Sequence, residues 1–205
     1  MIRKNLLNFK INFSFRSAKS RLLSFMKCFD PKNETCPSCG AKGQCRIYAS
    51  YERYIVDLNG GEVVSDILQI KRVLCSCGHT HAILPDFIVP YRQYSLPFIL
   101  FILKIWFSHA MTADDIEDTY GVSYKVLVRW RDIYGNHKDL WLGIVKSRQV
   151  SSLDFIENIF TQDPFSGFTI GFYQKTLYSF LQTHANPANC RQLPAGFAFS
   201  GGICT

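Results

Sequence analysis

The chain has 205 residues, of which 47% are hydrophobic and 19% are charged. A chain of this length and hydrophobicity can bury a core, which excludes an intrinsically disordered protein. Its formal net charge of +7 is consistent with a polyanionic partner such as nucleic acid.

The first segment is a basic arm, residues 1–34. Residues 1–35 contain eight lysines and arginines against two acids. Within it, 17–29 is an amphipathic stretch that we interpret as a helix, and 30–33 has the composition of a turn. Basic residues interrupt 2–21, so no secretory signal is predicted and the expected location is the cytoplasm.

Residues 36–90 carry the signals of β-structure. Residues 46–58 and 63–74 are rich in isoleucine, valine and tyrosine, and Asn59-Gly60-Gly61 between them predicts a tight hairpin turn. A third strand is expected over 81–89, ended by Pro90.

Two close pairs of cysteines flank the predicted hairpin, Cys36 with Cys39 and Cys75 with Cys77. Each pair is followed by a glycine, which lets the backbone turn tightly around two sulfurs that face one ion. The hairpin would bring the pairs together as in a zinc ribbon. Four thiolates complete a tetrahedral shell, so the sequence predicts a structural Zn²⁺.

The second pair is one residue shorter than the usual spacing, which leaves His79 and His81 as rival ligands to Cys77. A further reading is that the four cysteines are free thiols of a cytosolic core. The remaining cysteines, Cys28, Cys45, Cys190 and Cys204, are interpreted as bystanders. The motifs of zinc deaminases and of His-Glu-x-x-His proteases are absent, which argues against catalytic zinc.

From residue 95 the pattern changes to helices. An apolar helix is expected from Pro97 to about Ser108, and this run is far shorter than the roughly 20 residues of a membrane span. Thr112 and Asp115 predict a capping box for a second helix that ends at Tyr120 and Gly121. Ser123 is the expected cap of a third helix that runs to about Tyr134.

The second and third of these helices, over 112–134, have the layout of a helix-turn-helix. In this interpretation the third helix is the recognition helix that enters the major groove. The candidate DNA contacts on it are Ser123, Tyr124, Lys125, Arg129 and Arg131. The alternative is an ordinary helical hairpin with a solvated charged face, because residues 111–121 carry four acids and no base.

Three strings carry a resemblance to a known family: Arg72 to Pro85 with its Cys-Ser-Cys-Gly-His-Thr-His core, Pro90 to Leu96, and Leu127 to Trp130. They resemble an uncharacterised bacterial family that accompanies insertion-sequence transposases and carries a zinc-ribbon-like module before a helix-turn-helix. The likeness covers roughly residues 34–145. It implies a mobile-element context and no particular reaction. It also draws attention to His79 and His81, as metal ligands or as residues that shape the loop of the second cysteine pair.

Together these observations predict an α+β fold with four segments: the basic arm (1–34), a zinc-ribbon-like module (35–92), a three-helix helix-turn-helix unit (93–145) and a mostly helical tail (146–205). The predicted function is a non-catalytic, zinc-dependent DNA-binding protein of a transposable element. Its expected partner is double-stranded DNA, with a transposase subunit as a further candidate. No membrane and no small-molecule substrate is expected.

Two other functions stay open from the sequence. A catalytic or degenerate transposase would need a carboxylate triad to hold two metal ions, and the candidates are Asp154, Glu157 and Asp163. A zinc-ribbon adaptor would bind protein through the aromatic side chains of the tail. Those are Phe155, Phe160, Phe165, Phe168, Phe172 and Tyr173. Residues 174–183, like 152–160, are expected to be helical.

Overall fold

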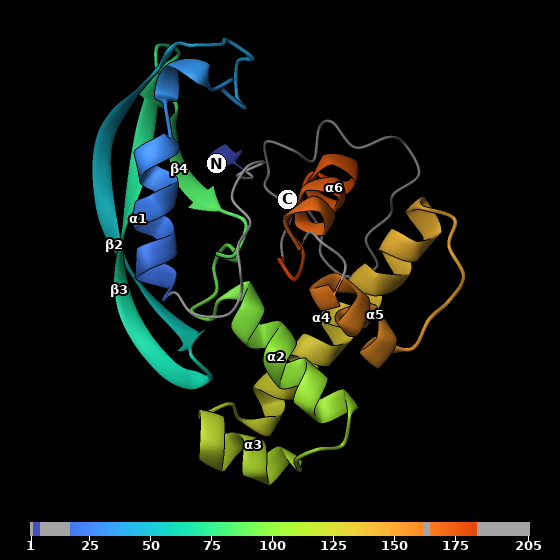
Figure 1. Ribbon diagram of the computed structural model, residues 1–205. Helices are drawn as coiled ribbons and strands as arrows, with labels where there is room; N and C mark the ends of the chain where they lie inside the picture. The colour runs from blue at the N-terminus through green and yellow to red at the C-terminus, as the bar shows by residue number, and fades with distance from the viewer. Residues whose placement is uncertain (1, 5–16, 162–164, 184–205) are drawn as a thin grey trace.

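The computed structural model describes residues 2–4, 17–161 and 165–183, and it has a mixed α+β fold (Figure 1). Its elements are β1 (Ile2–Lys4), α1 (Ala18–Cys28), the short 3-10 helix η1 (Pro31–Asn33), β2 (Cys45–Asn59), β3 (Glu62–Cys75), β4 (Thr80–Pro85), α2 (Leu96–Phe107), α3 (Ala113–Tyr120), α4 (Tyr124–Ile144), α5 (Ser152–Thr161) and α6 (Phe165–Thr176). The sheet and α1 lie to one side of Figure 1, and α2 to α6 lie to the other.

The sheet is built on the long hairpin of β2 and β3, as the sequence predicts. The strands pair in register from Asn59 opposite Glu62 to Cys45 opposite Cys75, with one irregularity between Ile47 and Ala49. Gly60 and Gly61 form the turn with positive φ, the geometry that suits a two-residue hairpin loop. The strand order is β1-β4-β3-β2, and β1 pairs in parallel with β4.

The third strand is shorter than predicted. The sequence suggests a strand over 81–89, but β4 ends at Pro85. The chain turns there, because the backbone N–H of Ile88 returns to the carbonyl of Pro85, and Ile88 then forms an isolated bridge with Ser95. Residues 86–95 therefore connect the sheet to α2, and they touch β2 through an isolated parallel bridge between Val56 and Tyr94.

The part of the basic arm that the structure describes is packed against the sheet. α1 begins after its N-cap Ser17 and buries Ala18, Leu22 and Phe25. These side chains share a core with Leu68 and Ile70 of β3. The helix predicted over 17–29 is confirmed, whereas the rest of the arm, residues 5–16, lies outside the described residues.

A buried carboxylate joins α1, β2 and α2. Asp57 of β2 is 1% exposed, forms an ion pair with Arg21 of α1 and accepts a hydrogen bond from the hydroxyl of Ser95. The same Ser95 hydroxyl accepts the backbone N–H of Phe98 and so caps α2. The guanidinium of Arg21 also lies 4.5 Å from the ring centre of Phe87. The side chain of Asp57 thereby holds α1 against the sheet and also positions Ser95 at the start of α2.

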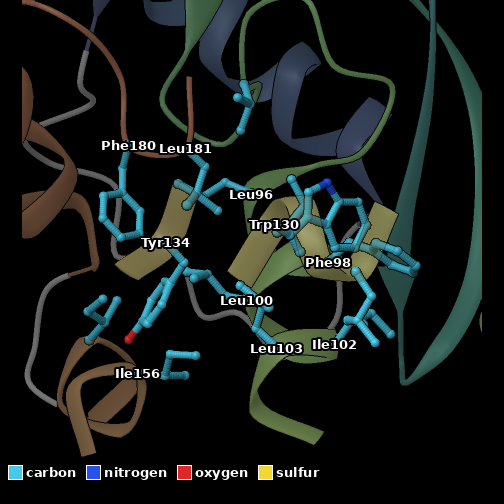
Figure 2. Close-up of a cluster of buried hydrophobic side chains, with 14 of the residues drawn as sticks. Leu96, Phe98, Leu100, Ile102, Leu103, Trp130, Tyr134, Ile156, Phe180 and Leu181 are labelled. Atoms are coloured by element: carbon cyan, nitrogen blue, oxygen red, sulfur yellow. The ribbon is translucent and has the colours of Figure 1, made fainter. Parts of the chain in front are cut away.

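The helices share one hydrophobic core (Figure 2). Leu100 and Leu103 of α2 pack in it with Trp130 and Tyr134 of α4. Ile156 of α5 and the segment after α6 belong to the same core, since Phe180 makes an edge contact with Tyr134 at 5.9 Å between ring centres. The residues beyond 145 are therefore packed on the helices that precede them.

Two helix predictions are wrong. α4 continues to Ile144 and does not end near Tyr134, because Tyr134, His137 and Leu142 are buried on its inner face. The second error is the helix expected over 174–183: α6 covers Phe165–Thr176 and stops where Leu177 takes a positive φ of 62°.

The remaining helix boundaries follow the predicted caps. Pro97 lies in the first turn of α2, and Thr112 and Asp115 form the predicted capping box of α3. Gly121 ends α3 in the left-handed conformation. Among the described helices, none combines the length and the apolar character needed to cross a bilayer.

Candidate metal centre

The first cysteine pair sits on a tight backbone loop. A bridge between Thr35 and Lys42 closes the loop, and the backbone N–H of Cys36 donates to the carbonyl of Ala41 at 2.9 Å. The N–H of Gly40 returns to the carbonyl of Cys36 at 2.9 Å. Gly40 has a φ of +75°, which a residue with a side chain rarely adopts. The glycine after the pair therefore allows the turn that aims both sulfurs inward.

The second pair occupies the turn between β3 and β4. The N–H of Gly78 donates to the carbonyl of Cys75 at 2.9 Å, and the N–H of Cys75 donates to the carbonyl of His79 at 3.0 Å. Gly78 has a φ of +86°. The turn closes within five residues, which explains why this pair is one residue shorter than the first. A hydrogen bond from the N–H of Ser76 to the carbonyl of Gln44 ties it to the start of β2.

The two loops bring the four predicted thiols together. The sulfurs of Cys36, Cys39, Cys75 and Cys77 all lie within 4.8 Å of one another and could hold a metal ion. The Sγ atoms of Cys36 and Cys77 are 3.8 Å apart, as are those of Cys39 and Cys75. Each close contact joins one sulfur of the first pair to one of the second, so the cluster cross-links the two loops.

Both rival histidines lie beside this cluster. Nε2 of His81 is 3.3 Å from the sulfur of Cys36, and Nδ1 of His79 is 3.5 Å from the sulfur of Cys77. His81 is buried and His79 is exposed. Burial lowers the pKa of His81 to about 4, so its ring is neutral near pH 7 and has one N–H to donate. Each histidine is thus placed to donate to a thiolate as well as to replace one.

The thiols differ in how readily they lose a proton. A backbone hydrogen bond from Cys77 lowers the pKa of the Cys75 thiol to about 6. A backbone hydrogen bond at His79 acts to lower the pKa of Cys77, but desolvation and the neighbouring thiols outweigh it and raise that pKa to about 12. The first thiolate forms easily and the next one is opposed by the charge already present. A cation between the sulfurs removes that opposition.

A fifth cysteine lies close to the cluster without joining it. Cys45 is paired in register with Cys75 and is buried in the sheet core. Burial raises the pKa of its thiol to about 11, so it stays protonated. Cys28, at the end of α1, is exposed. Cys190 and Cys204 lie outside the described residues.

The candidate DNA contacts lie at the start of α4, away from the cysteines. Tyr124, Lys125 and Arg129 are exposed, and Ser123 is half-buried. Lys125 and Arg129 are four residues apart and so share one face of the helix. Arg131 is also exposed, but it forms an ion pair with Asp132 at 2.8 Å and lies 5.7 Å from the ring centre of Trp106. It therefore points along a different face from Lys125 and Arg129.

The acidic residues of α3 have local roles that the sequence only partly indicates. Asp115 accepts the hydroxyl and the backbone N–H of Thr112 in the capping box. Glu117 accepts the backbone N–H of Tyr124 at 3.3 Å, which makes it the cap of α4. Ser123 occupies the predicted N-cap position, but its side chain makes no capping hydrogen bond.

Two further candidate sites from the sequence are the carboxylates of a transposase and the aromatic side chains of the tail. Asp154 is bonded to Ser151 at the start of α5, and Glu157 forms an ion pair with Lys104 at 3.2 Å. Asp163 lies outside the described residues. Of the tail aromatics, Phe155 and Phe172 are buried in the helical core, Phe160, Phe168 and Tyr173 are half-buried, and nothing is described for the side chain of Phe165.

Residues 36–130 match a domain of unknown function (DUF6431). The matched segment begins at the first cysteine of the cluster and ends at Trp130, so it contains the whole sheet hairpin, α2, α3 and the exposed start of α4. No curated protein and no solved structure matches the chain. The cysteine cluster and the start of α4 thus fall within one recognised segment.

Proposed function

We propose that this chain is a non-catalytic, zinc-dependent DNA-binding protein of a transposable element. In this proposal the four cysteines hold a structural Zn²⁺ in a zinc-ribbon-like module, and α3 and α4 act as a helix-turn-helix on double-stranded DNA. A transposase subunit is its candidate protein partner. The cysteine cluster supports the metal, and the face of α4 with Lys125 and Arg129 supports the DNA.

The sulfur distances fit zinc. Zn²⁺ binds thiolates at about 2.3 Å in a tetrahedron, and the edge of such a tetrahedron is about 3.8 Å. The sulfurs of Cys36 and Cys77, and those of Cys39 and Cys75, are 3.8 Å apart. Four thiolates leave no coordination position for water or substrate, which favours a structural ion over a catalytic one. His81 is buried against Cys36, and its ring N–H would donate to the metal-bound thiolate and hold it in place.

The observation that carries the DNA proposal is the exposed basic face at the start of α4. Lys125 and Arg129 form no ion pair with any residue that the structure describes, although four acids lie on the neighbouring helix. Two of those acids, Asp115 and Glu117, are engaged at helix ends. The two cations are therefore free to contact phosphates while the helix core, anchored by Leu127 and Trp130, holds them in place.

Salt dependence of DNA binding tests this proposal. Each lost phosphate contact should lower the slope of log affinity against log salt by about one, so the double variant Lys125→Ala/Arg129→Ala should lower it by about two. Arg148→Ala is the matched control, since Arg148 is exposed in the loop after α4. Affinity that barely changes with salt, or a double variant that binds duplex DNA as the control does, would contradict the proposal and favour the protein-binding adaptor.

A further inference from the structure

A surface cleft lies between the hairpin and the segment that leads to α2. Its volume is about 630 Å³. Three tyrosines and two arginines line it together with Gln93 and with small and apolar residues, and no acid lines it among the residues that the structure describes. The arginines are Arg53 and Arg92, and the tyrosines are Tyr51, Tyr54 and Tyr91. A cationic and aromatic lining without a counter-charge is unusual for a cleft that holds only water.

Arg53 fixes one wall of the cleft. Its Nη2 donates to the carbonyl of Val89 at 2.6 Å and also to the carbonyl of Arg92. These bonds tie the connecting segment to β2, and burial lowers the pKa of Arg53. The guanidinium of Arg53 is thus hydrogen-bonded to backbone carbonyls, and it holds the backbone of Arg92 in position.

Arg92 has no such partners. Its Nε and Nη2 are buried and make no hydrogen bond with any described residue. Burial lowers its pKa, and the charge of Arg129 on α4 lowers it further. A guanidinium in these surroundings is stabilised by an anion, and its planar donors match the oxygens of a phosphate.

Tyr91 stands next to Arg92 in a strained conformation. Its φ is 61° and its side chain is 73% exposed. The left-handed region is uncommon for residues other than glycine, asparagine and aspartate, and a bulky aromatic residue there costs free energy. The fold therefore keeps an aromatic ring in solvent, at a backbone cost, beside a guanidinium that has two nitrogens without a hydrogen bond to any described residue.

We propose that the cleft binds a nucleotide unit, with its phosphate at Arg92 and its base stacked on Tyr91. Aromatic side chains beside a cationic groove are the usual means of holding unpaired nucleotides. The unit could be a free nucleotide or part of a single strand, since both offer the same phosphate and base. The proposal does not depend on the function proposed for α4, although Arg92 lies close enough to Arg129 of that helix for the two charges to interact.

Calorimetric titration of the full chain tests the proposal with three probes: thymidine 5′-monophosphate, a short oligothymidylate, and an abasic oligonucleotide of the same length. The oligothymidylate should bind more tightly than the abasic strand, because only the former can stack. Arg92→Gln should weaken its binding about tenfold or more, since a bond between charged groups is lost. Arg148→Gln, the same change elsewhere on the surface, should have little effect.

Two substitutions of Tyr91 separate binding from folding. Tyr91→Phe keeps the ring and should bind as the native chain does. Tyr91→Asn removes the ring, and asparagine tolerates positive φ, so affinity for oligothymidylate should fall about tenfold while the melting temperature stays equal or rises. This surface variant keeps the test valid if Arg92→Gln does not fold.

Saturable binding of the monophosphate assigns the cleft to free nucleotides, and binding of the oligonucleotide alone assigns it to a strand. Binding of neither probe, equal affinity for the abasic strand, or equal losses in Arg92→Gln and Arg148→Gln would overturn the proposal. Lys125→Ala should leave oligothymidylate binding unchanged, so this proposal and that for α4 fail independently.

Discussion

The sheet and the helical unit both bury mainly apolar residues, but of the two cores only that of the sheet includes cysteines among the described residues. The core around the sheet includes Cys36, Cys45 and Cys75, whereas the side chains of Tyr48 and Tyr54 on β2 are exposed. The helical core is larger and contains interlocking rings such as those of Tyr134, Phe172 and Phe180, with further support from α5 and α6. Apolar burial can therefore sustain the helices, whereas a metal ion held by the four cysteines, as proposed, would add stability at the end of the sheet.

The largest expected effect is the loss of the sheet when metal binding is prevented. Cys36→Ser, or a strong chelator, should unfold the cysteine loops and the adjoining half of the hairpin, because a structural zinc contributes on the order of 10 kcal/mol. Hydrogen exchange should accelerate in β2, β3 and β4 and change much less in α2 and α4. Cys28→Ser, at an exposed cysteine, is the control. If chelation changed the exchange rates of the sheet no more than those of the helices, the sheet would not depend on metal more than the helices do.

Next in size is the link between the two regions. Asp57→Asn leaves the guanidinium of Arg21 buried without its carboxylate and weakens the cap of α2, so the free energy of unfolding should fall by about 3–5 kcal/mol. Urea denaturation measures the change, and Asp118→Asn on the exposed surface of α3 is the matched control. A loss no greater than that of the control would show that Asp57 does not couple the sheet to the helices.

The helical core should respond to pH through His137. Its Nδ1 accepts the backbone N–H of Leu181 at 2.9 Å, and burial lowers its pKa from 6.5 to about 4. Between these values the unfolded chain binds a proton that the folded chain does not, so stability falls as pH falls from 6.5 to 4. The contribution reaches about 3 kcal/mol.

Comparison with His137→Asn isolates this effect, since asparagine can accept the same hydrogen bond and does not titrate. The variant should lose less stability than the native chain over that pH range when both are measured by urea denaturation with metal bound. Parallel pH profiles for the two proteins would be inconsistent with a buried neutral His137.

The smallest effect concerns the histidines at the cysteine cluster. If His81 donates to the thiolate of Cys36, His81→Ala should weaken metal binding by roughly 10–100-fold, the usual cost of losing a side chain that hydrogen-bonds to a metal ligand. His79→Ala should have a weaker effect, because His79 is exposed. Competition with a chelator of known affinity measures both. The complete loss of metal in either variant would make that histidine a ligand instead.

Local features of the fold could be predicted, and features that depend on distant contacts could not. The hairpin turn, the capping box at Thr112 and each cysteine pair are encoded within a few residues, and the hairpin then brings the two pairs together. The length of α4 is not, because His137 and Leu142 are held in the helix by packing against residues of the tail. A glycine within that segment, Gly135, suggests an earlier end that tertiary packing overrides.

The sites show the same division. The spacing of the cysteines predicts the cluster, but the pairing of Asp57 with Arg21 joins residues 36 positions apart, and no sequence pattern indicates it. The cleft likewise brings Arg53 of β2 beside Arg92, which follows β3 and β4 in the chain. Pro90 and Tyr91 belong to a distinctive string of the sequence, yet their place beside Arg53 in the cleft becomes visible only in the fold.

Metal content with thiol titration tests the central claim most directly. The purified chain should contain one zinc ion per molecule, and a chelator should release it and make four further thiols reactive, those of Cys36, Cys39, Cys75 and Cys77, out of the eight in the sequence. Cys77→Ser should bind the ion more weakly. A chain that folds without metal, with these four thiols equally reactive before and after chelation, would contradict the account.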